Sequence, residues 1–557
     1  MTRTTLDAIR RRLPSGADLL ALAAIFAAVV ALQLARGAYA NEFGGHPDEA
    51  AHYITGLMVR DYVLSPDRSS PMRFAEDYYA HYPKVALGHW PPIFYVAQAA
   101  WAIPFGPSRA SVMLLMATLT TALAGTLYHV VARRHGAIPG LVAALVLVGL
   151  PIAQDQAGMV MADIPVALLS FWAALAFARY LDGGRWRDST AFGAFAALTI
   201  LTKANGIFLA LVPPLALVLS RRWRLLARPS FYWSAALVCA LCAPWFAFAR
   251  NPKMLDGFSR EQVGLAYLLK GMWYYGRVQT TVGYGVACLA IVGLTALRRR
   301  SGGEQHAIPG LAAAMIAMVL GVLLVCCAVP VGFEPRYFLP AVAPLLVLVV
   351  EGVEALARHL RPSRLAWLHV AAFAVIACEM FTVSGAPYRG FSGVARNLLT
   401  RPDLAAAVAL VSSDAEGEGM FVAAVAGSER RPGHVVLRAS KALARSSWLG
   451  FDYEPIYRTA AEVGDYLERV PVHLVVVDTS ISTLAARIGQ QPELLQAVEG
   501  RPDRWGLVGS YSRVRPGGET PEAVKVFRRL GLRSAPQAPI RVEVEGAFGP
   551  FSTVAQP

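Results

Sequence analysis

The feature that most constrains this chain is a series of long apolar segments separated by arginine clusters. The first apolar segment, residues 17–36, follows an arginine triplet at 10–12, and another segment ends at Arg133 and Arg134. A helix needs about 20 apolar residues to cross a bilayer, and loops on the cytoplasmic side are rich in Lys and Arg. We therefore expect a polytopic α-helical membrane protein whose N-terminus faces the cytoplasm.

Composition narrows the class of protein further. Of the 557 residues, 55% are hydrophobic and only 16% are charged, which is too apolar for an ordinary soluble enzyme. The net charge is +14, but much of the arginine lies beside apolar segments, which indicates membrane orientation rather than nucleic-acid binding. All six cysteines lie within apolar segments, where core packing is favoured over a disulfide or a metal site.

The alternation of arginine clusters and apolar segments predicts eleven crossings. Residues 190–220 have arginines at both ends and must cross twice, with 202–206 as the turn. Residues 91–106 are short and begin with two prolines, so we expect them to lie at the outer interface as a helix. The other crossings are expected at 17–36, 110–131, 138–153, 164–181, 231–249, a segment ending at Arg298–Arg300, 308–331, 337–357 and 365–383.

The chain is expected to divide into two domains. Residues 17–386 form the membrane domain, with a cytoplasmic N-terminus at 1–16 and a first outer loop at 37–107. Residues 387–535 alternate short β-type runs with helical patterns, which predicts an extracytoplasmic α/β domain of Rossmann-like pattern. Residues 536–557 are expected to be a disordered tail. Within the α/β domain, strands are expected at 407–413, 420–426, 472–478 and 505–511, helices at 459–470 and 484–500, and a loop at 413–419.

Ionisable residues collect in the loops that this topology places outside. The stretch FGGHPDEAAHYITG, residues 43–56, holds Asp48 and Glu49 between His46 and His52. Carboxylates can deprotonate an acceptor hydroxyl or hold a divalent cation, and cationic side chains can hold a phosphate. Such groups at the outer bilayer boundary suit a lipid-phosphate sugar donor, whose phosphate leaves as an anion. The other candidates are Lys84, His89, Asp163, Lys203, Arg277 and Arg336.

Several motifs occur in order along the membrane part. HPDEAAHY follows the first apolar segment, GHWPPIFY occupies 88–95, MADIPVALLSFW 161–172, LTKANG 201–206 and EPRYFLPAVAP 334–344. Together they resemble the motifs of GT-C-type membrane glycosyltransferases, close to the group that contains protein O-mannosyltransferases and lipid A aminoarabinose transferases. The resemblance covers about residues 17–384 and leaves out the C-terminal domain.

The resemblance implies a reaction and a role for each candidate. A sugar would move from a polyprenyl-phosphate donor to a hydroxyl of a lipid, glycan or protein, with inversion at the anomeric carbon. The transfer would take place on the periplasmic face of a bacterial inner membrane. Asp48 would be the base or a metal ligand, with Glu49 and Asp163 as its support. The donor phosphate would contact residues from Lys84, His89, Lys203, Arg277 and Arg336.

Two points of the resemblance are weaker than the others. Pro47 stands where relatives usually have an arginine before the acidic pair, and Trp90 directly precedes the two prolines, so the phosphate contacts are less firmly indicated than the acids. The sequence establishes no cofactor, and a divalent cation is the one candidate. Asp48 and His52 are spaced i, i+4 and share a helix face, which permits a metal pair but favours a hydrogen-bonded pair.

Each candidate also has a structural interpretation. Asp48 and Glu49 favour the first turn of a helix through its dipole, and Asp163 could cap the helix that follows it. Lys203 could extend its ammonium to the interface, and Arg277 could belong to an aromatic belt. Two rival functions remain at this stage: a membrane transporter without transferase activity, or a binding role for the α/β domain beside an inactive membrane part.

Overall fold

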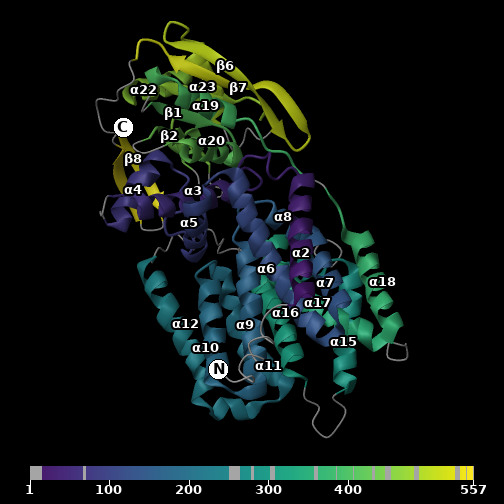
Figure 1. The fold of residues 1–557 in the computed structure, drawn as a ribbon. Helices are drawn as coiled ribbons and strands as arrows, with labels where there is room; N and C mark the ends of the chain where they lie inside the picture. The colour runs from purple at the N-terminus through teal and green to yellow at the C-terminus, as the bar shows by residue number, and fades with distance from the viewer. Residues whose placement is uncertain are drawn as a thin grey trace.

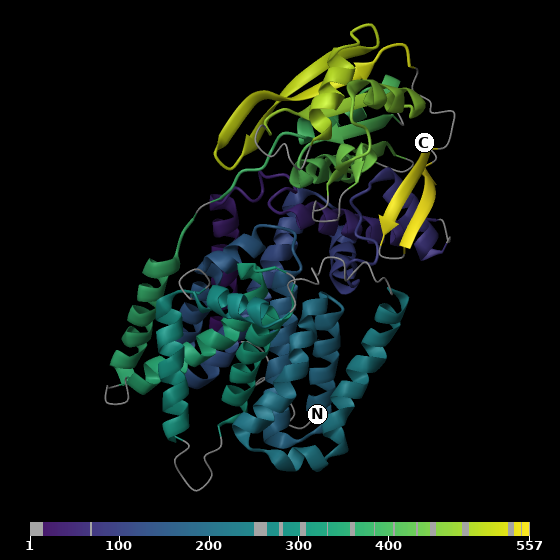
Figure 2. The same ribbon diagram turned by 180° about the vertical axis from the view of Figure 1, so that it is seen from behind.

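A bundle of helices fills one end of the molecule, an α/β domain fills the other, and the short helices of the first loop lie between them (Figures 1 and 2). This is a computed structural model. It describes residues 15–66, 70–249, 264–277, 282–300, 308–330, 332–356, 362–383, 385–404, 407–429, 433–445, 453–481, 489–532, 540–546 and 549–555.

Every segment that was predicted to cross the membrane contains a helix in the described part of the chain. Within the described ranges, six helices are long and apolar enough to span a membrane, and α7 with α8, which meet at a bend of 68°, would make a seventh span. The polytopic helical membrane fold is thereby confirmed, while the number of eleven crossings stays a prediction. The long helices are α2 (Gly16–Ala35), α6 (Arg109–His135), α9 (Asp163–Gly183), α12 (Pro229–Phe248), α16 (Gly310–Ala328) and α17 (Leu339–Leu356), which the turn η5 (Pro335–Phe338) precedes.

Shorter helices complete the bundle. They are α7 (Ala137–Gly149), α8 (Pro151–Ala157), α10 (Trp186–Ile200), η1 (Ala204–Leu211), α11 (Val212–Ser220), η2 (Trp223–Ala227), α13 (Leu265–Gly276), α15 (Tyr284–Arg300) and α18 (Pro362–Met380). The predicted double crossing at 190–220 is α10 followed by η1 and α11, with Lys203 in the turn between them.

Local sequence signals set the ends of these helices. Ser15 and Asp18 form a capping box at the start of α2, and the Ser108 side chain accepts a hydrogen bond from the Ser111 amide at the start of α6. Gly136, with φ of 97°, makes the tight turn from α6 to α7, a conformation that glycine adopts without a steric penalty. Pro151 is the first residue of α8, directly after the bend. The amide of a first helical residue has no partner within the helix, so proline loses no hydrogen bond there.

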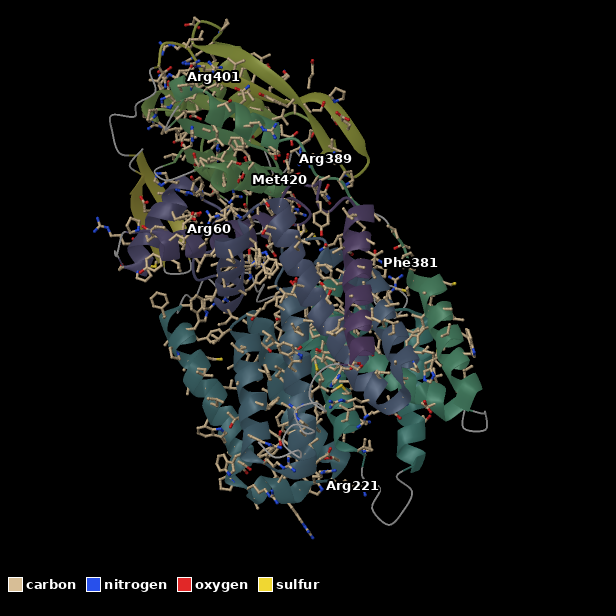
Figure 3. All side chains as sticks on the ribbon, viewed as in Figure 1. Arg60, Arg221, Phe381, Arg389, Arg401 and Met420 are labelled. Atoms are coloured by element: carbon tan, nitrogen blue, oxygen red, sulfur yellow. The ribbon has the colours of Figure 1, made fainter. Side chains whose placement is uncertain are left out.

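The bundle has a buried centre and an exposed rim. In the most apolar stretch of α9, 78% of the residues are buried, and in that of η5 with α17, 83% are buried. In the most apolar stretch of α12, only 11% of the residues are buried. Asp163 and Arg336 lie at the ends of these two central elements. Figure 3 places Arg221, after α11, at the end of the bundle opposite Arg60 of the first loop, so the predicted outer residues share one end.

The first loop folds into three helices, α3 (Pro47–Leu64), α4 (Pro71–His81) and α5 (Ile93–Phe105). The predicted interfacial helix at 91–106 is α5, a 13-residue apolar helix. It packs closely on α3, since a Cβ on Gly56 would lie 2.7 Å from Oε1 of Gln98. Gln98 Nε2 also donates to the His52 carbonyl at 3.3 Å. These contacts fix α3 on the end of the bundle.

The C-terminal domain is built on a five-stranded sheet of order β2-β1-β5-β7-β6. Strands β2, β1 and β5 are parallel, and β7 is antiparallel to both β5 and β6. The strands of this sheet are β1 (Val408–Ser412), β2 (Val435–Arg438), β5 (Leu474–Asp478), β6 (Trp505–Arg515) and β7 (Gly518–Arg529). The helices are α19 (Ser392–Thr400), η6 (Pro402–Leu404), α20 (Ala415–Ser428), α21 (Ala439–Ala442), α22 (Ala460–Arg469) and α23 (Gln490–Glu499), and β3 (Ala444–Arg445) pairs with β4 (Glu454–Pro455).

Three predictions for this domain need correction. Residues 420–426, which were predicted to be a strand, lie inside α20. Residues 413–419, which were predicted to be a loop, supply the cap and first turn of that helix, and the Asp414 side chain accepts a hydrogen bond from Gly417 N at 2.8 Å. An unbroken apolar run has no period of two, so a buried helix and a buried strand look alike in sequence. In place of the disordered tail at 536–557, β8 (Ile540–Gly546) and β9 (Gly549–Ala555) form a hairpin. The first residues of the helix predicted at 484–500 lie outside the described residues.

The α/β domain is fastened to the first loop at several points. The Glu42 carboxylate accepts hydrogen bonds from the amides of Gly390, Phe391 and Ser392, where the chain enters the domain. Tyr82 hydrogen-bonds to Glu429 at the end of α20. These bonds hold the domain against the end of the bundle at which the candidate residues lie.

Candidate active site

The acidic pair sits at the start of α3, where the backbone fixes its direction. His46 is the N-cap and its Nδ1 accepts from the Asp48 amide at 3.1 Å, while Pro47 is the first helical residue. The φ of proline suits this position, and the helix dipole favours a carboxylate in the first turn. The two neighbours Asp48 and Glu49 therefore point about 100° apart around the helix.

Asp48 faces the end of the central helices. Its Oδ2 lies 3.3 Å from Nη2 of Arg336 and 3.4 Å from Nδ1 of His46. Nε of Arg336 is also 2.6 Å from Oε2 of Glu334. Burial alone would raise the pKa of Asp48, but His46 and Arg336 lower it to about 2. Asp48 is therefore an ionised carboxylate beside the guanidinium of Arg336.

Asp163 and Lys203 form a second pair beside the first. Nζ of Lys203 lies 2.8 Å from Oδ1 of Asp163, the first residue of α9. The Tyr337 ring joins the two pairs, since Nζ of Lys203 is 5.1 Å and Cζ of Arg336 is 5.3 Å from its centroid. We call the set His46, Asp48, Asp163, Lys203, Glu334 and Arg336 the mouth cluster.

Three buried atoms of the mouth cluster have no hydrogen bond among the described residues. They are Oδ2 of Asp163, an acceptor, and Nη1 and Nε of Arg336, both donors. Nε is nevertheless ion-paired, 2.6 Å from Oε2 of Glu334, so Nη1 is the unused donor. Asp163 is 2% and Arg336 6% exposed, so water does not reach them freely. Buried polar groups in native proteins are nearly always paired. An unused acceptor and an unused donor side by side suit a ligand that brings a hydroxyl and an anionic group.

His52 lies deeper, against an aromatic wall. Its Nδ1 is 2.9 Å from the Tyr95 hydroxyl, and its ring lies on Trp90 with centroids 4.2 Å apart. Burial lowers the pKa of His52 to about 3, so the imidazole is neutral. Asp48 and His52 are not joined by a third His, Cys, Asp or Glu in an arrangement that could hold a metal among the described residues. The divalent cation stays a prediction.

Glu49 is an anchor. Its side chain is fully buried, and its carboxylate accepts from Gly45 N at 2.9 Å and from Val160 N at 3.1 Å. Nη1 of Arg109, at the start of α6, lies 2.5 Å from it. Arg109 also donates to the carbonyls of Ala38 and Gly158. Glu49 therefore supports Asp48 by tying α3 to the loop before it and to α6.

Lys84 and His89 both lie within electrostatic range of Asp48. Lys84 is 2% exposed, and burial lowers its pKa to about 7. Burial also lowers the pKa of His89, whose ring meets Trp90 edge to face. Arg277 is exposed at the end of α13, with its guanidinium 4.8 Å from the Trp273 ring, as the aromatic-belt interpretation expects.

The structure thus brings Asp48, Asp163, Lys203 and Arg336 together and gives Glu49 and Arg277 other surroundings. Sequence reasoning did not single out Arg109, Tyr95 or Tyr337, which hold or join the site residues. Tyr337 was within reach, because it follows Arg336 directly in EPRYFLP. Arg109 gave no signal, since an arginine after Ser108 reads as an ordinary helix start.

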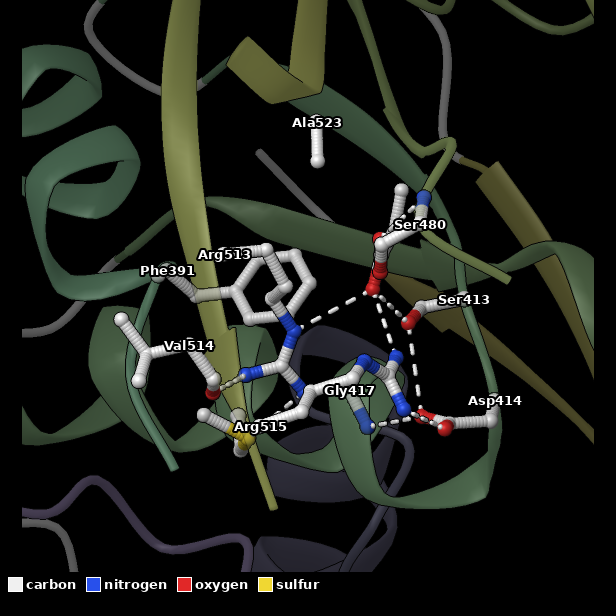
Figure 4. Close-up of polar contacts among 12 residues, drawn as sticks. Phe391, Ser413, Asp414, Gly417, Ser480, Arg513, Val514, Arg515 and Ala523 are labelled. Atoms are coloured by element: carbon white, nitrogen blue, oxygen red, sulfur yellow. Dashed lines mark hydrogen bonds and ion pairs between the residues drawn. The ribbon is translucent and has the colours of Figure 1, made fainter. Parts of the chain in front are cut away.

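A second charged network lies in the α/β domain, at the carboxyl ends of β1 and β5 (Figure 4). The chain leaves β1 toward β2 and enters β5 on the other side, and such a switch point is the usual ligand crevice of parallel sheets. Here the long β6–β7 hairpin bends over it and inserts Arg513, whose side chain is fully buried and 3.2 Å from Asp478. We call Asp414, Asp478, Arg513 and Arg515 the switch-point cluster.

The switch-point cluster is closed upon itself. Nη1 of Arg513 donates to the Arg389 carbonyl at 2.9 Å, and Nη2 lies 3.4 Å from Sδ of Met420. Asp478 accepts from Arg513, from Arg515 at 2.8 Å and from two serine side chains. The place where a nucleotide would lie in a doubly wound domain is filled by the protein's own side chains.

Comparison with known proteins places the helical part in a family context. The family described as dolichyl-phosphate-mannose-protein mannosyltransferase matches residues 89–248. No curated protein matches the chain in sequence. The apo crystal structure of ArnT from Cupriavidus metallidurans is 15% identical, with a TM-score of 0.54 over 91% of this chain and 97% of that chain.

An archaeal enzyme shares the same fold. The oligosaccharyltransferase of Archaeoglobus fulgidus tethered with an acceptor peptide is 13% identical, with a TM-score of 0.51 over 93% of this chain and 76% of that chain. The oligosaccharyltransferase AglB of the same organism, in complex with an inhibitory peptide and a dolichol-phosphate, is 13% identical, with a TM-score of 0.52 over 90% and 74%. The chain is a membrane-embedded protein with the GT-C fold and resembles GT-C-type glycosyltransferases.

Proposed function

We propose that this protein is a glycosyltransferase that moves a sugar from a polyprenyl-phosphate donor to a hydroxyl of a lipid, glycan or protein. The observation that carries the proposal is the pair of unused buried atoms, Oδ2 of Asp163 and Nη1 of Arg336, beside the ionised Asp48. The first can accept a hydrogen bond from a sugar or acceptor hydroxyl. The second can donate to a phosphate oxygen.

The donor class has support from the proteins of similar fold. The matching family is described by a dolichyl-phosphate sugar, and one archaeal structure contains a dolichol-phosphate. A lipid phosphate that leaves the anomeric carbon carries the developing negative charge. Arg336 would hold it with a planar fork and Lys84 as a point charge, which lowers the barrier to departure.

The low pKa of Asp48 without a donor implies that the donor binds before Asp48 acts as a base. With a pKa of about 2, Asp48 is a weak base, and an effective general base has a pKa nearer the working pH. Part of that lowering comes from Arg336, 3.3 Å away. A donor phosphate that recruits Arg336 weakens its hold on Asp48 and raises the pKa of the carboxylate. The base is then strengthened only when a donor is in place.

The geometry of transfer follows from the same arrangement. Asp48 would remove the proton of the acceptor hydroxyl as that oxygen attacks the anomeric carbon, and the bond to the phosphate oxygen breaks on the opposite face. A single displacement of this kind inverts the anomeric configuration. The periplasmic face of a bacterial inner membrane, with the N-terminus in the cytoplasm, stays our proposal for its location, on the arginine distribution of the inner loops.

The direct test is transfer of a labelled sugar from polyprenyl phosphate by the full chain in proteoliposomes. Membranes of a strain that lacks the protein supply the acceptor. We expect the variant Asp48→Asn to transfer about 10²–10⁴-fold more slowly, the usual loss when a general base is removed. The matched control is Asp155→Asn, whose carboxylate is 48% exposed and paired with Arg36, and which should stay within about twofold.

Two results would overturn the proposal. Transfer at the wild-type rate by a folded Asp48→Asn variant would remove the base role. Flux of a labelled lipid-linked or anionic solute across the liposomes, with no sugar transferred by the wild type, would replace the enzyme by a transporter. Deletion of the chain after about residue 388 tests the third possibility. Transfer that survives the deletion would show that the membrane part is active and that the α/β domain is dispensable, which excludes a binding domain beside an inactive membrane part.

A further inference from the structure

The first turn of α20 lies over the site from the α/β domain. A Cβ on Gly419 would lie 3.0 Å from Cβ of Ala50 on α3 and 3.2 Å from Cε of Lys84. A Cβ on Gly44 would meet Met420 at 2.2 Å. At these two positions a larger residue would need its neighbours to shift, and the close contacts bring α20 against the helix that carries Asp48.

Lys84 lies at this junction. Its Nζ is 3.4 Å from the carbonyl of Ala415, the first residue of α20. The charged groups that act on it come from three elements: Asp48 on α3, Arg438 on β2, and Glu416 and Glu418 on α20. Arg438 is a like charge, so the three carboxylates are what favours the protonated lysine.

The two carboxylates of α20 differ in what they are bound to. Glu418 is fully buried and lies 2.9 Å from Nε of Arg438, and Ser440 N donates to it at 2.9 Å. Glu416 is half-buried, and no side chain of another described residue gives it a hydrogen bond or an ion pair. Its electrostatic partners are Asp414, Lys84 and His46, and burial raises its pKa first of all. Within the described part of the α/β domain, Glu416 is thus a carboxylate without a hydrogen bond or ion pair to another side chain, and His46 of the mouth cluster is among its electrostatic partners.

The position of Glu416 is fixed from behind. Asp414 caps α20 by accepting from Gly417 N at 2.8 Å, and Arg515 pairs with both Asp414 and Asp478. On the other side Arg438 donates to the Pro83 carbonyl at 3.4 Å, one residue before Lys84. The switch-point cluster therefore anchors the turn that carries Glu416, and β2 anchors the loop that carries Lys84.

We propose that Glu416 is a positioning residue that the α/β domain supplies to the transferase site, holding Lys84 in its charged form for the donor phosphate. The inference rests on the function proposed above and adds a role for the C-terminal domain. The ammonium in that apolar pocket is close to losing its proton at neutral pH, so each nearby carboxylate matters. Without Glu416, Asp48 and Glu418 remain as its anionic neighbours and Arg438 as its cationic one.

The test compares Glu416→Gln with the wild type in binding and in transfer, at pH 6 and pH 8. Nζ of Lys84 is 3.4 Å from the carbonyl of Ala415, the residue next to Glu416, and the test assumes that loss of the Glu416 charge lowers the lysine pKa by about 1 unit from its value of about 7. Binding of polyprenyl phosphate in nanodiscs, followed by tryptophan fluorescence, should weaken about tenfold at pH 8 and about twofold at pH 6. KM for the donor should rise in the same way while kcat changes less, and Glu416→Asp should recover part of the loss.

The matched control is Asp465→Asn, an exposed carboxylate on α22 of the same domain, which should bind as the wild type does. An equal loss at both pH values would overturn the inference, because a merely structural fault has no reason to follow the protonation of Lys84. Wild-type binding by Glu416→Gln would overturn it as well. If the wild type binds polyprenyl phosphate but transfers no sugar, the proposed function fails while the role of Glu416 in phosphate binding is still measured.

Discussion

The mouth cluster and the switch-point cluster are both made of carboxylates and cationic side chains, yet their hydrogen bonds are used differently. In the switch-point cluster every guanidinium nitrogen of Arg513 has a partner and Asp478 is held by four side chains, and among the described atoms of the cluster Nε of Arg515 alone is buried without a hydrogen bond. In the mouth cluster both a donor, Nη1 of Arg336, and an acceptor, Oδ2 of Asp163, are buried without a hydrogen bond. A network that its own side chains nearly saturate specifies structure, whereas one that leaves both a donor and an acceptor unused has binding capacity for a ligand.

The difference also separates two kinds of arginine. Arg513 reaches the switch point from a hairpin and replaces a ligand there, so its removal should affect folding more than chemistry. Arg336 lies within the turn η5 before α17 and reaches Asp48 through Nη2 alone, so its removal should affect chemistry more than folding. Mutations that keep the approximate size of the arginine side chain but change its hydrogen-bond donors can test the role of Arg513 and that of Arg336.

The largest effect is expected for Arg513→Met. Loss of one partner from a buried ion pair costs about 3–5 kcal/mol, and the lower end applies because Arg515 still pairs with Asp478. Hydrogen exchange of the β1 and β5 amides in the full chain should show the opening free energy falling by about 3 kcal/mol. Arg504→Met, an exposed arginine paired with Glu468, should cost less than about 1 kcal/mol. Equal costs would show that the switch-point cluster is not structural.

The next effect concerns Arg336→Lys, which keeps the charge and removes the planar fork. We expect kcat/KM for transfer to fall about 100-fold, the loss typical of one donor to a developing anion, with little change in the unfolding temperature. The control is Arg36→Lys, in an ion pair with Asp155 away from the mouth cluster, which should keep its activity within about twofold. If Arg336→Lys lowered the unfolding temperature without lowering the activity, the mouth cluster would have a structural role and not a catalytic one.

The smallest effect is a pH dependence of stability that Lys84 creates. Burial lowers its folded pKa from 10.5 to about 7, so between these values the unfolded chain holds a proton that the folded chain lacks. Stability should therefore rise with pH across this window, by about 1.4 kcal/mol per unit. Unfolding at pH 7, 8 and 9 should show this slope in the wild type and its loss in Lys84→Met. Lys525→Met, an exposed lysine on β7, should keep the slope; its loss there too would assign the slope to another group.

Much of the membrane fold could be predicted from sequence because its signal is local. Apolar length and arginine clusters are properties of single segments, and each predicted segment does contain a helix. The candidate acids and cations could be named for the same reason, since they stand next to helix ends. The sequence could not show which of these acidic and cationic residues contact one another in the folded protein. Asp48 and Arg336 are 288 residues apart, and only the packing of α3 on η5 joins them.

The errors have physical causes too. Glu49 differs from Asp48 by one position, and the turn of the helix sends one carboxylate to Arg109 and the other to Arg336. The strand predicted at 420–426 is helical because α20 is buried between α3 and the sheet, where both of its faces are apolar. The hairpin partner β7, with GETPEAVKVFRR, is polar in much of its length, and its strand character comes from pairing with β5 and β6.

The glycine contacts between α20 and the first loop have a consequence for how such proteins diversify and are engineered. A side chain at Gly44 or Gly419 would press on Met420, or on Ala50 and Lys84, so a larger residue at either position calls for a change in the facing surface. A chimera that exchanges the C-terminal domain alone would place foreign side chains against Ala50 and Lys84. A graft intended to alter acceptor preference would therefore have to carry residues 43–56 and the first turns of α20 as one unit.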